Sequence, residues 1–349
     1  MNRFVKSIIR LKWLIISVVM VLTVFFGYQT KNLHINSDII SSLPDYEPVA
    51  KLYKDIGTEF GGNDMGMIVL ENENIFNVEV IEHIKQITDS IRYTLGVSTV
   101  TSLTNILDIK SSEWGIEIGK LFDEYELPTD PSDLDSLKAY VLSKEMYRGV
   151  IVSDDCKATA IMFTLLPDAD NQTIAKEIKE KIKNMNLPET IYFGGLPMMM
   201  NDINDLIISD IIWLIPIVFL VIAIILLISF QSFRGVLLPL LTAGISVVWT
   251  LGIMSVAGYE LTIISNIIPV VLLAVGSAYT IHVLNSINHM ALQDRKQALI
   301  KGVAYVIIPV ILAAVTTATG FVSFVFGAYL TMIKDFGIFT AVGTIIALL

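Results

Sequence analysis

Apolar residues gather along this chain into six long runs, separated by stretches that are rich in charge. A helix that crosses a membrane needs about 20 predominantly apolar residues, because each residue adds about 1.5 Å through a hydrocarbon core about 30 Å thick. The runs predict five complete spans and one partial span, over residues 11–28, 210–230, 236–257, 262–284, 303–328 and 336–349. We therefore expect an α-helical polytopic membrane protein with six spans, of which the last is incomplete.

The segment between the first two runs, residues 29–208, has the shorter periods of an α+β domain. Residues 65–71 and 97–103 are typical of strands, and residues 77–96 between them are typical of an amphipathic helix. The elements that follow are a helix over 130–144, a hairpin over 149–166 turning at Asp154-Asp155, a helix over 171–185 and a strand over 190–197. This order predicts split β-α-β, ferredoxin-like elements, whereas residues 111–130 have no clear period.

Composition supports a membrane protein, because 54% of the 349 residues are hydrophobic, only 17% are charged and the mean hydropathy is +0.66. Segment 29–208 carries 30 Asp and Glu against 15 Lys and Arg. The opposite side of the predicted membrane is basic, with Arg3, Lys6, Arg10, Lys12, Arg234, Arg295, Lys296 and Lys301. Because basic loops stay in the cytoplasm, we expect a cytoplasmic N-terminus with an uncleaved first span over 1–28, an extracytoplasmic domain over 29–208 and spans two to six over 209–349.

The acidic segment argues against several classes of function. Nucleic acid is not an expected partner, because a polyanion needs a basic stripe and this segment has none. Cys156 is the only cysteine, and His34 and His83 are isolated, so neither an internal disulfide nor metal-ligand spacing occurs. Nucleophile-elbow and Walker motifs are also missing from the sequence. We therefore expect no enzyme activity, no metal and no cofactor.

Several local motifs occur in a distinctive order around the spans. They are SDIISSLPDYEP after the first span, GGLPMMMNDINDLIISDI before the second, SFQSFRGVLLPLL after the second, TTATGFVSFVF in the fifth and DFGIFTAVGTIIALL in the sixth. In this order the chain resembles the N-terminal half of an RND (resistance–nodulation–division) superfamily transporter, of the MmpL-like and hopanoid-exporter-like branch.

The resemblance implies a porter-like outer domain and a location in a bacterial cytoplasmic (inner) membrane. It implies an exporter of lipidic, hydrophobic or amphiphilic cargo that uses the proton motive force. Membrane lipids and the cargo would then be its partners, together with a second six-span half, because the family builds its transporter from two such halves.

The fourth span holds the candidate site. The family places a proton-binding acid on this span in a Gly-x-x-x-Asp-Tyr-like motif, and the matching stretch here runs from Ala274 to Tyr279. Ala278 stands at the position of the acid, while Tyr279 matches the family tyrosine. This half therefore lacks the carboxylate that the family uses for proton coupling.

His282 is a candidate to replace that carboxylate. Ala278, His282, Asn285 and His289 are four, three and four residues apart, so they share one helix face, and an imidazole titrates near neutral pH. The alternative is an interfacial role, because His282 lies roughly 30 Å of helix beyond Thr262, where the predicted span begins. The sequence leaves both roles open.

The fifth span contributes hydroxyl groups near its middle. They either line a hydrated path beside the fourth span or bond back to their own helix, as threonines in spans commonly do. The candidate residues for coupling to protons or cargo are Ser277, Tyr279, His282, Thr316 and Thr317.

Two other functions stay open at this point. A SecD/SecF-like protein-translocation accessory has six spans and an outer α+β domain, but its fourth-span Asn-Asp signature is absent here. A non-transporting lipid sensor or scaffold, like the sterol-sensing membrane domains, is favoured by the missing acid at Ala278. The last predicted span, Phe336 to Leu349, would be only about 21 Å long, which predicts that the chain is a piece of a longer, two-half protein. The alternative is a stand-alone half-transporter that forms homo-oligomers, so that its second half is another protomer.

Overall fold

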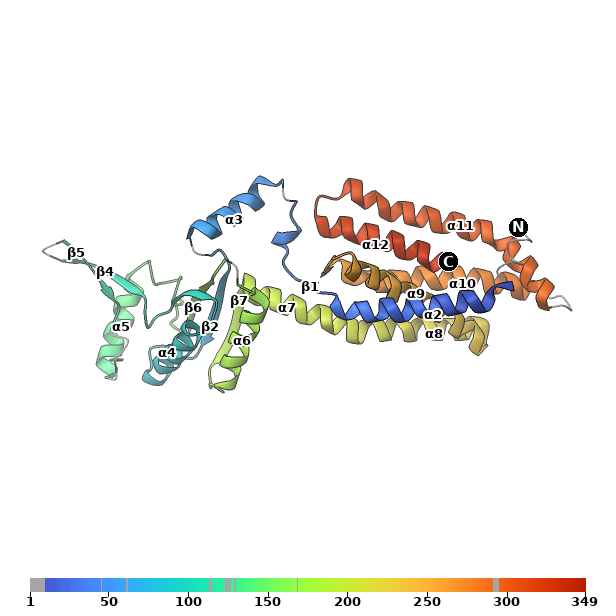
Figure 1. Ribbon diagram of the computed structural model, residues 1–349. Coiled ribbons are helices and arrows are strands. Elements are labelled where there is room, and N and C mark those ends of the chain that lie inside the picture. The colour runs from blue at the N-terminus through green and yellow to red at the C-terminus, as the bar shows by residue number, and fades with distance from the viewer. Residues whose placement is uncertain are drawn as a thin grey trace. The chain divides into compact units, whose positions relative to one another are not determined.

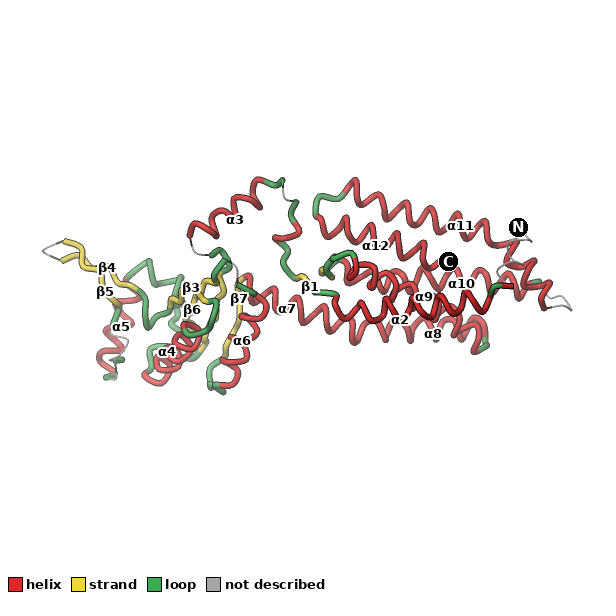
Figure 2. Tube along the Cα trace, viewed as in Figure 1, coloured by secondary structure: helices red, strands yellow, loops and turns green. Residues whose placement is uncertain are grey.

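The structure, a computed structural model, describes residues 10–44, 46–60, 62–112, 115–122, 127–128, 130–167, 169–290 and 295–349. It divides into two compact units: the α+β unit, Asp45–Ile203, and the membrane unit, Met1–Pro44 with Asn204–Leu349. The α+β unit is shorter at both ends than the predicted segment 29–208. Figure 1 shows the order of the elements, and Figure 2 shows that strands gather in the α+β unit and helices in the membrane unit.

The α+β unit is built on a four-stranded sheet. Its strands are β2 (Met65–Glu71), β3 (Val97–Thr101), β6 (Ala158–Leu165) and β7 (Thr190–Gly195), in the order β3-β6-β2-β7 with every pair antiparallel. Helix α4 (Val78–Arg92) connects β2 to β3, and α6 (Asn171–Asn184) connects β6 to β7. Each β-α-β unit is therefore split by a strand of the other, as the order of apolar patterns predicted.

Helices α4 and α6 both begin at a side-chain cap. The Asn77 side chain accepts a hydrogen bond from the Glu79 backbone N–H at 3.1 Å, and Asp170 accepts from the Thr173 N–H at 3.3 Å. Such caps satisfy backbone donors that a helix start leaves free. The Thr173 hydroxyl also donates to Asp170, which lowers the pKa of this carboxyl below its ordinary value.

The core of the α+β unit lies between the sheet and these two helices. Side chains of β2 alternate between buried and exposed positions, as expected for a strand with one covered face. Helices α4 and α6 present branched side chains at three- and four-residue intervals to that face. The central buried residues are Ile68, Leu70, Ile84, Ile87, Ile91, Ile161, Phe163, Ile178 and Ile182.

Further elements of this unit are α3 (Pro48–Phe60), α5 (Pro131–Ser143) and a hairpin of β4 (Leu107–Ser112) and β5 (Gly115–Lys120). The hairpin extends into the stretch 111–130, where the sequence showed no period. The period was not recognised because each strand has only six residues. The hairpin is anchored at its base by buried Asp108, whose carboxylate accepts from the hydroxyls of Tyr147 at 2.8 Å and Tyr140 at 3.0 Å. Burial and the Asp108 charge raise the pKa of Tyr147, so it stays a neutral donor.

The hairpin predicted over residues 149–166 does turn at Asp154-Asp155, where the Ser153 N–H donates to the Ala158 carbonyl at 2.9 Å, but its first half is not a strand. Only β6 forms a strand, and Val152 makes isolated bridges to Arg148 and Thr159. The chain turns back already at Gly149, whose φ of 74° suits glycine and whose N–H donates to the Val152 carbonyl at 2.7 Å.

The membrane unit contains, within the described residues, six helical segments long and apolar enough to cross a membrane. The second is continuous from α7, which starts in the α+β unit, through a π-helical segment η3 (Asp210–Leu214). The helices are α2 (Lys12–Gln29), α7 (Leu196–Ser209), α8 (Ile215–Phe230), α9 (Phe233–Val256), α10 (Ile268–His289), α11 (Arg295–Gly327) and α12 (Thr331–Leu348). Strands β1 (Ile35–Asn36) and β8 (Leu261–Thr262) form the short parallel pair.

The sixth helix is longer than the predicted partial span. It begins at Thr331 rather than Phe336, so Lys334 and Asp335, which precede the predicted span, lie in its first turns. Its 18 residues correspond to about 27 Å of helix.

Helix α10 lies at the centre of the membrane unit and packs against α8, α9, α11 and α12. Small residues let these helices approach closely. A Cβ atom added at Gly276 would lie 3.2 Å from the Ala347 Cβ and 3.3 Å from Ala243. One added at Gly343 would overlap the Leu272 side chain and lie 2.6 Å from the Thr250 hydroxyl. The fourth span is therefore held by close helix contacts on several sides.

Candidate functional site

Tyr279 is the centre of the candidate site. Only 6% of this residue is exposed, and it packs with Val310 and Ala314 of α11, with Ala347 and Leu348 of α12 beside them. Its hydroxyl is buried and makes no hydrogen bond to any described residue. A buried hydroxyl without a partner costs about 1–3 kcal/mol, so the burial of this phenol in an apolar environment is not offset by a hydrogen bond.

The threonines of α11 divide between two sides of that helix. Thr317 is half-buried and interacts with the Tyr279 hydroxyl, although not in the geometry of a hydrogen bond. Thr316 is exposed and its hydroxyl donates to its own helix at the Ala313 carbonyl, 2.9 Å away. The structure therefore brings Tyr279 and Thr317 together and turns Thr316 away from them.

Ser277 is buried but bonds within its own helix, because its hydroxyl donates to the Ala274 carbonyl at 3.0 Å. Other buried hydroxyls near α10 do the same, such as Thr250, which donates to the Ser246 carbonyl at 2.7 Å. Thr340 of α12 differs, because its buried hydroxyl has no partner among the described residues. Most of these buried hydroxyl groups are therefore hydrogen-bonded within their own helix.

His282 lies outside the buried cluster. Its side chain is exposed on α10, and Asn285 and His289 are exposed with it. Ala278, at the position of the family acid, is half-buried. The structure thus separates a buried phenol at Tyr279 from an exposed imidazole at His282.

An apolar groove of about 580 Å³ lies between α2, α8 and α9. Thr23 is its one polar residue among the described ones that line it, and its hydroxyl already donates to the Val19 carbonyl and accepts from the Trp249 indole N–H at 2.9 Å. Gly244 lines the groove, and a Cβ there would lie 3.4 Å from the Phe219 ring, so a large side chain at this position would occupy it. The groove offers only hydrocarbon contacts. Sequence reasoning missed it, because it depends on three helices meeting.

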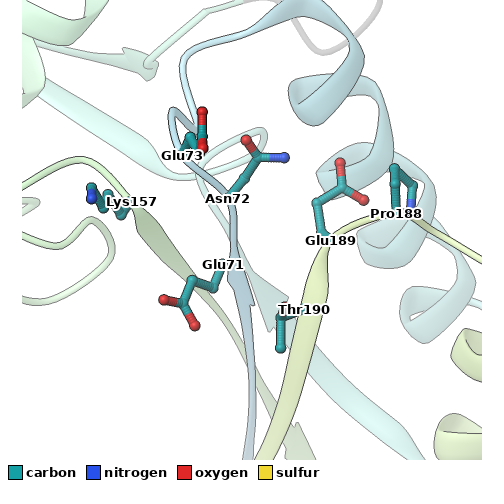
Figure 3. Close-up of a pocket in the computed structure, with 7 residues that line it drawn as sticks. All are labelled: Glu71, Asn72, Glu73, Lys157, Pro188, Glu189 and Thr190. Carbon is teal, nitrogen blue, oxygen red and sulfur yellow. The ribbon is translucent and has the colours of Figure 1, made fainter.

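A polar pocket of about 550 Å³ lies at one end of the sheet of the α+β unit (Figure 3). The Glu71 and Glu189 side chains point away from each other there. Glu189 is paired with His83 at 2.8 Å, and only 1% of its side chain is exposed. Its second carboxylate oxygen has no partner among the described residues but is closed off from solvent. The pocket therefore presents the solvated charges of Glu71, Glu73 and Lys157 to a ligand, and Glu189 ties α4 to the start of β7.

No group of three or more His, Cys, Asp and Glu side chains that could hold a metal ion occurs among the residues that the structure describes. The site contains a phenol, hydroxyls and an exposed imidazole instead. These groups can donate, accept or relay a proton but form no nucleophile–base pair.

Comparisons with known proteins agree with the membrane architecture. The sequence profile of the MMPL family matches residues 41–349. A membrane protein of Methanocaldococcus jannaschii is 25% identical over 352 residues, which cover 95% of this chain and 86% of the archaeal protein. The archaeal protein is therefore long enough for one six-span unit of this kind but too short for two.

Proposed function

Because the chain belongs to the MMPL family, we propose that it is one six-span unit of an RND-type secondary transporter. In this proposal it exports lipidic or hydrophobic cargo with the proton motive force across a bacterial cytoplasmic membrane. The N-terminus lies in the cytoplasm and the acidic α+β unit lies outside, in accord with the charge difference between the loops.

The single observation that carries the choice of cargo is the groove between α2, α8 and α9. It lies among membrane-spanning helices and leaves no polar atom of its lining free. A ligand there gains stability only by burying hydrocarbon, at about 25 cal/mol for each Å² removed from water. A lipid tail or a similar amphiphile fits this chemistry.

Coupling would depend on the central helix α10. Tyr279 has a buried hydroxyl without a hydrogen bond, and Thr317 lies beside it. Such a phenol can take part in a proton relay when a partner group arrives. His282 lies on an exposed face of the same helix, where its imidazole is open to contact with a second unit.

The second unit, in this proposal, is another copy of the chain. The archaeal relative supports this, because 86% of its length is already covered by one unit. Two copies related by a two-fold axis would reproduce the two-half arrangement of the family.

The proposal is tested with the full chain reconstituted in liposomes that carry a pH gradient. The probe is a pyrene-labelled fatty acid, followed by its fluorescence. Because an uncharged fatty acid crosses a bilayer unaided, movement is counted as the excess over protein-free liposomes. We expect pH-driven movement that Gly244→Leu, which fills the groove, reduces about tenfold or more. Gly327→Leu is the control, because no atom lies within 4 Å of a Cβ there. Equal rates for both variants would remove the groove from the transport path, and no movement by the wild type would refute transport of this class.

A lipid sensor is the second candidate, favoured by Ala278 in place of an acid. It predicts a different result in the same assay. The fatty acid would bind in the groove, and Gly244→Leu would weaken binding, but the pH gradient would move no probe.

A further inference from the structure

The β4–β5 hairpin carries its apolar side chains on one face. The register pairs Ile109 with Ile118 and Leu107 with Lys120. Because side chains alternate along a strand, Leu107, Ile109, Ile116 and Ile118 point to the same side. These four side chains are between 50% and 76% exposed. We call them the hairpin face.

The hairpin face points away from the body of the α+β unit. Asp108, on the opposite face, is buried at the base and holds the hairpin through the hydroxyls of Tyr140 and Tyr147. Glu117 and Gly119 alternate with the apolar residues and share that opposite face. All six residues of β5 are exposed, so among the hairpin residues whose side chains are described only Asp108 at the base is buried, and the apolar side chains are not covered.

Nothing in the described part of the chain covers this face or extends the two strands. β4 and β5 pair only with each other, and Figure 1 shows them projecting from the unit beyond α5. An isolated two-stranded hairpin is marginally stable in water, and exposed apolar edges promote pairing with other chains. The hairpin face therefore has the character of a contact surface.

Charge restricts what can cover it. The α+β segment carries 30 acidic and 15 basic residues, so an anionic lipid surface repels it. Two copies also repel each other over most of their surface and meet most easily where charge is lowest. Lys120 is the one charged side chain that the register places on the hairpin face among residues whose side chains are described.

We propose that the hairpin face is the contact between the α+β units of two copies of this chain, stacked face to face about a two-fold axis. The inference rests on the proposal that two copies form the transporter. The inference additionally specifies the surface through which the two α+β units contact each other. A two-fold contact uses the same patch on both copies, and the apolar pairs of the hairpin supply such a patch.

The test uses the full chain in lipid nanodiscs and single cysteines at each position of the hairpin face. Cys156 gives little background, because it is buried and burial raises the pKa of its thiol. A short bis-maleimide should link two copies through a cysteine at Leu107, Ile109, Ile116 or Ile118. Glu117→Cys is the matched control, since its side chain points to the other face of the same strand. We expect at least tenfold less linked dimer from the control.

A charge variant supplies the second measurement. Ile118→Glu should shift the mass of the particle toward one copy and raise the salt concentration needed for dimers, whereas Leu95→Glu, at an exposed apolar residue elsewhere in the unit, should do neither. A wild-type dimer that transports the fatty acid but gives no linkage at any of the four positions overturns this inference and leaves the proposed function intact. Linkage without transport would instead support the contact and refute the function.

Discussion

The two units of this protein differ in the side chains that they bury. Most of the large fully buried side chains belong to the α+β unit, among them Phe163, Ile84 and Tyr147. In the membrane unit close helix contacts are made at small residues such as Gly252, Gly337 and Gly343, and many large apolar residues are exposed.

The difference shows how the solvent selects the core. In water, burial of apolar surface drives folding, so large branched residues move inside. Lipid tails solvate such residues as well as a protein interior does, so membrane helices associate through close packing of small residues. Large apolar side chains therefore mark the core of the α+β unit but the lipid-facing surface of the membrane unit.

The largest expected effect comes from shortening a core residue in water. Ile84→Ala should destabilise the α+β unit by about 2–5 kcal/mol, because it removes buried methylenes and leaves a cavity. Leu220→Ala, at an exposed position of α8, should change the stability of the membrane unit by about 0.5 kcal/mol or less. Pulse proteolysis in urea, read from the fragments of the full chain in detergent, measures both. Similar losses at the two sites would contradict the comparison.

An intermediate effect is expected from enlarging a small residue. Gly343→Leu would drive a side chain into Leu272 and Thr250, and overpacking of this kind costs about 1–3 kcal/mol. A thermal melt of the detergent-solubilised protein should show a lower transition temperature. Gly327→Leu, with open space around its Cβ, should melt like the wild type. An unchanged melt for Gly343→Leu would mean that α12 does not pack on α9 and α10 as described.

The smallest effect on stability is expected at the candidate site. Tyr279→Phe removes a hydroxyl that has no hydrogen-bond partner among the described residues, so stability should stay within about 1 kcal/mol or rise slightly. If the hydroxyl relays protons, pH-driven movement of the fatty acid should nevertheless fall. Parallel melts and liposome assays separate the two properties, with Thr316→Val as a control at an exposed, back-bonded hydroxyl. Transport at the wild-type rate would exclude Tyr279 from coupling.

Much of the architecture could be predicted from residue pattern, because long apolar runs and alternating strands are local signals. The caps at Asn77 and Asp170 are equally local. The hairpin over 107–120 was missed, because its apolar alternation is short and serves a surface rather than a core. The helix face shared by His282 and His289 follows from their spacing, but the proximity of Tyr279 to Thr317 and the groove beside Gly244 depend on how helices pack. No sequence period encodes that packing.

The first span is synthesised long before α9, the helix that it packs against. Its Thr23 hydroxyl accepts from the Trp249 indole, and its Gln29 carbonyl accepts from the Ser255 hydroxyl, each pair 226 residues apart in sequence. A ribosome that adds about 5–20 residues per second needs roughly 10 to 45 s to make that length of chain. Throughout that interval α2 lies in the bilayer without the helix it packs against. Membrane insertion factors and quality control therefore meet α2 as an isolated helix. The yield of folded protein then depends on whether α9 is completed before the unpaired first span is degraded.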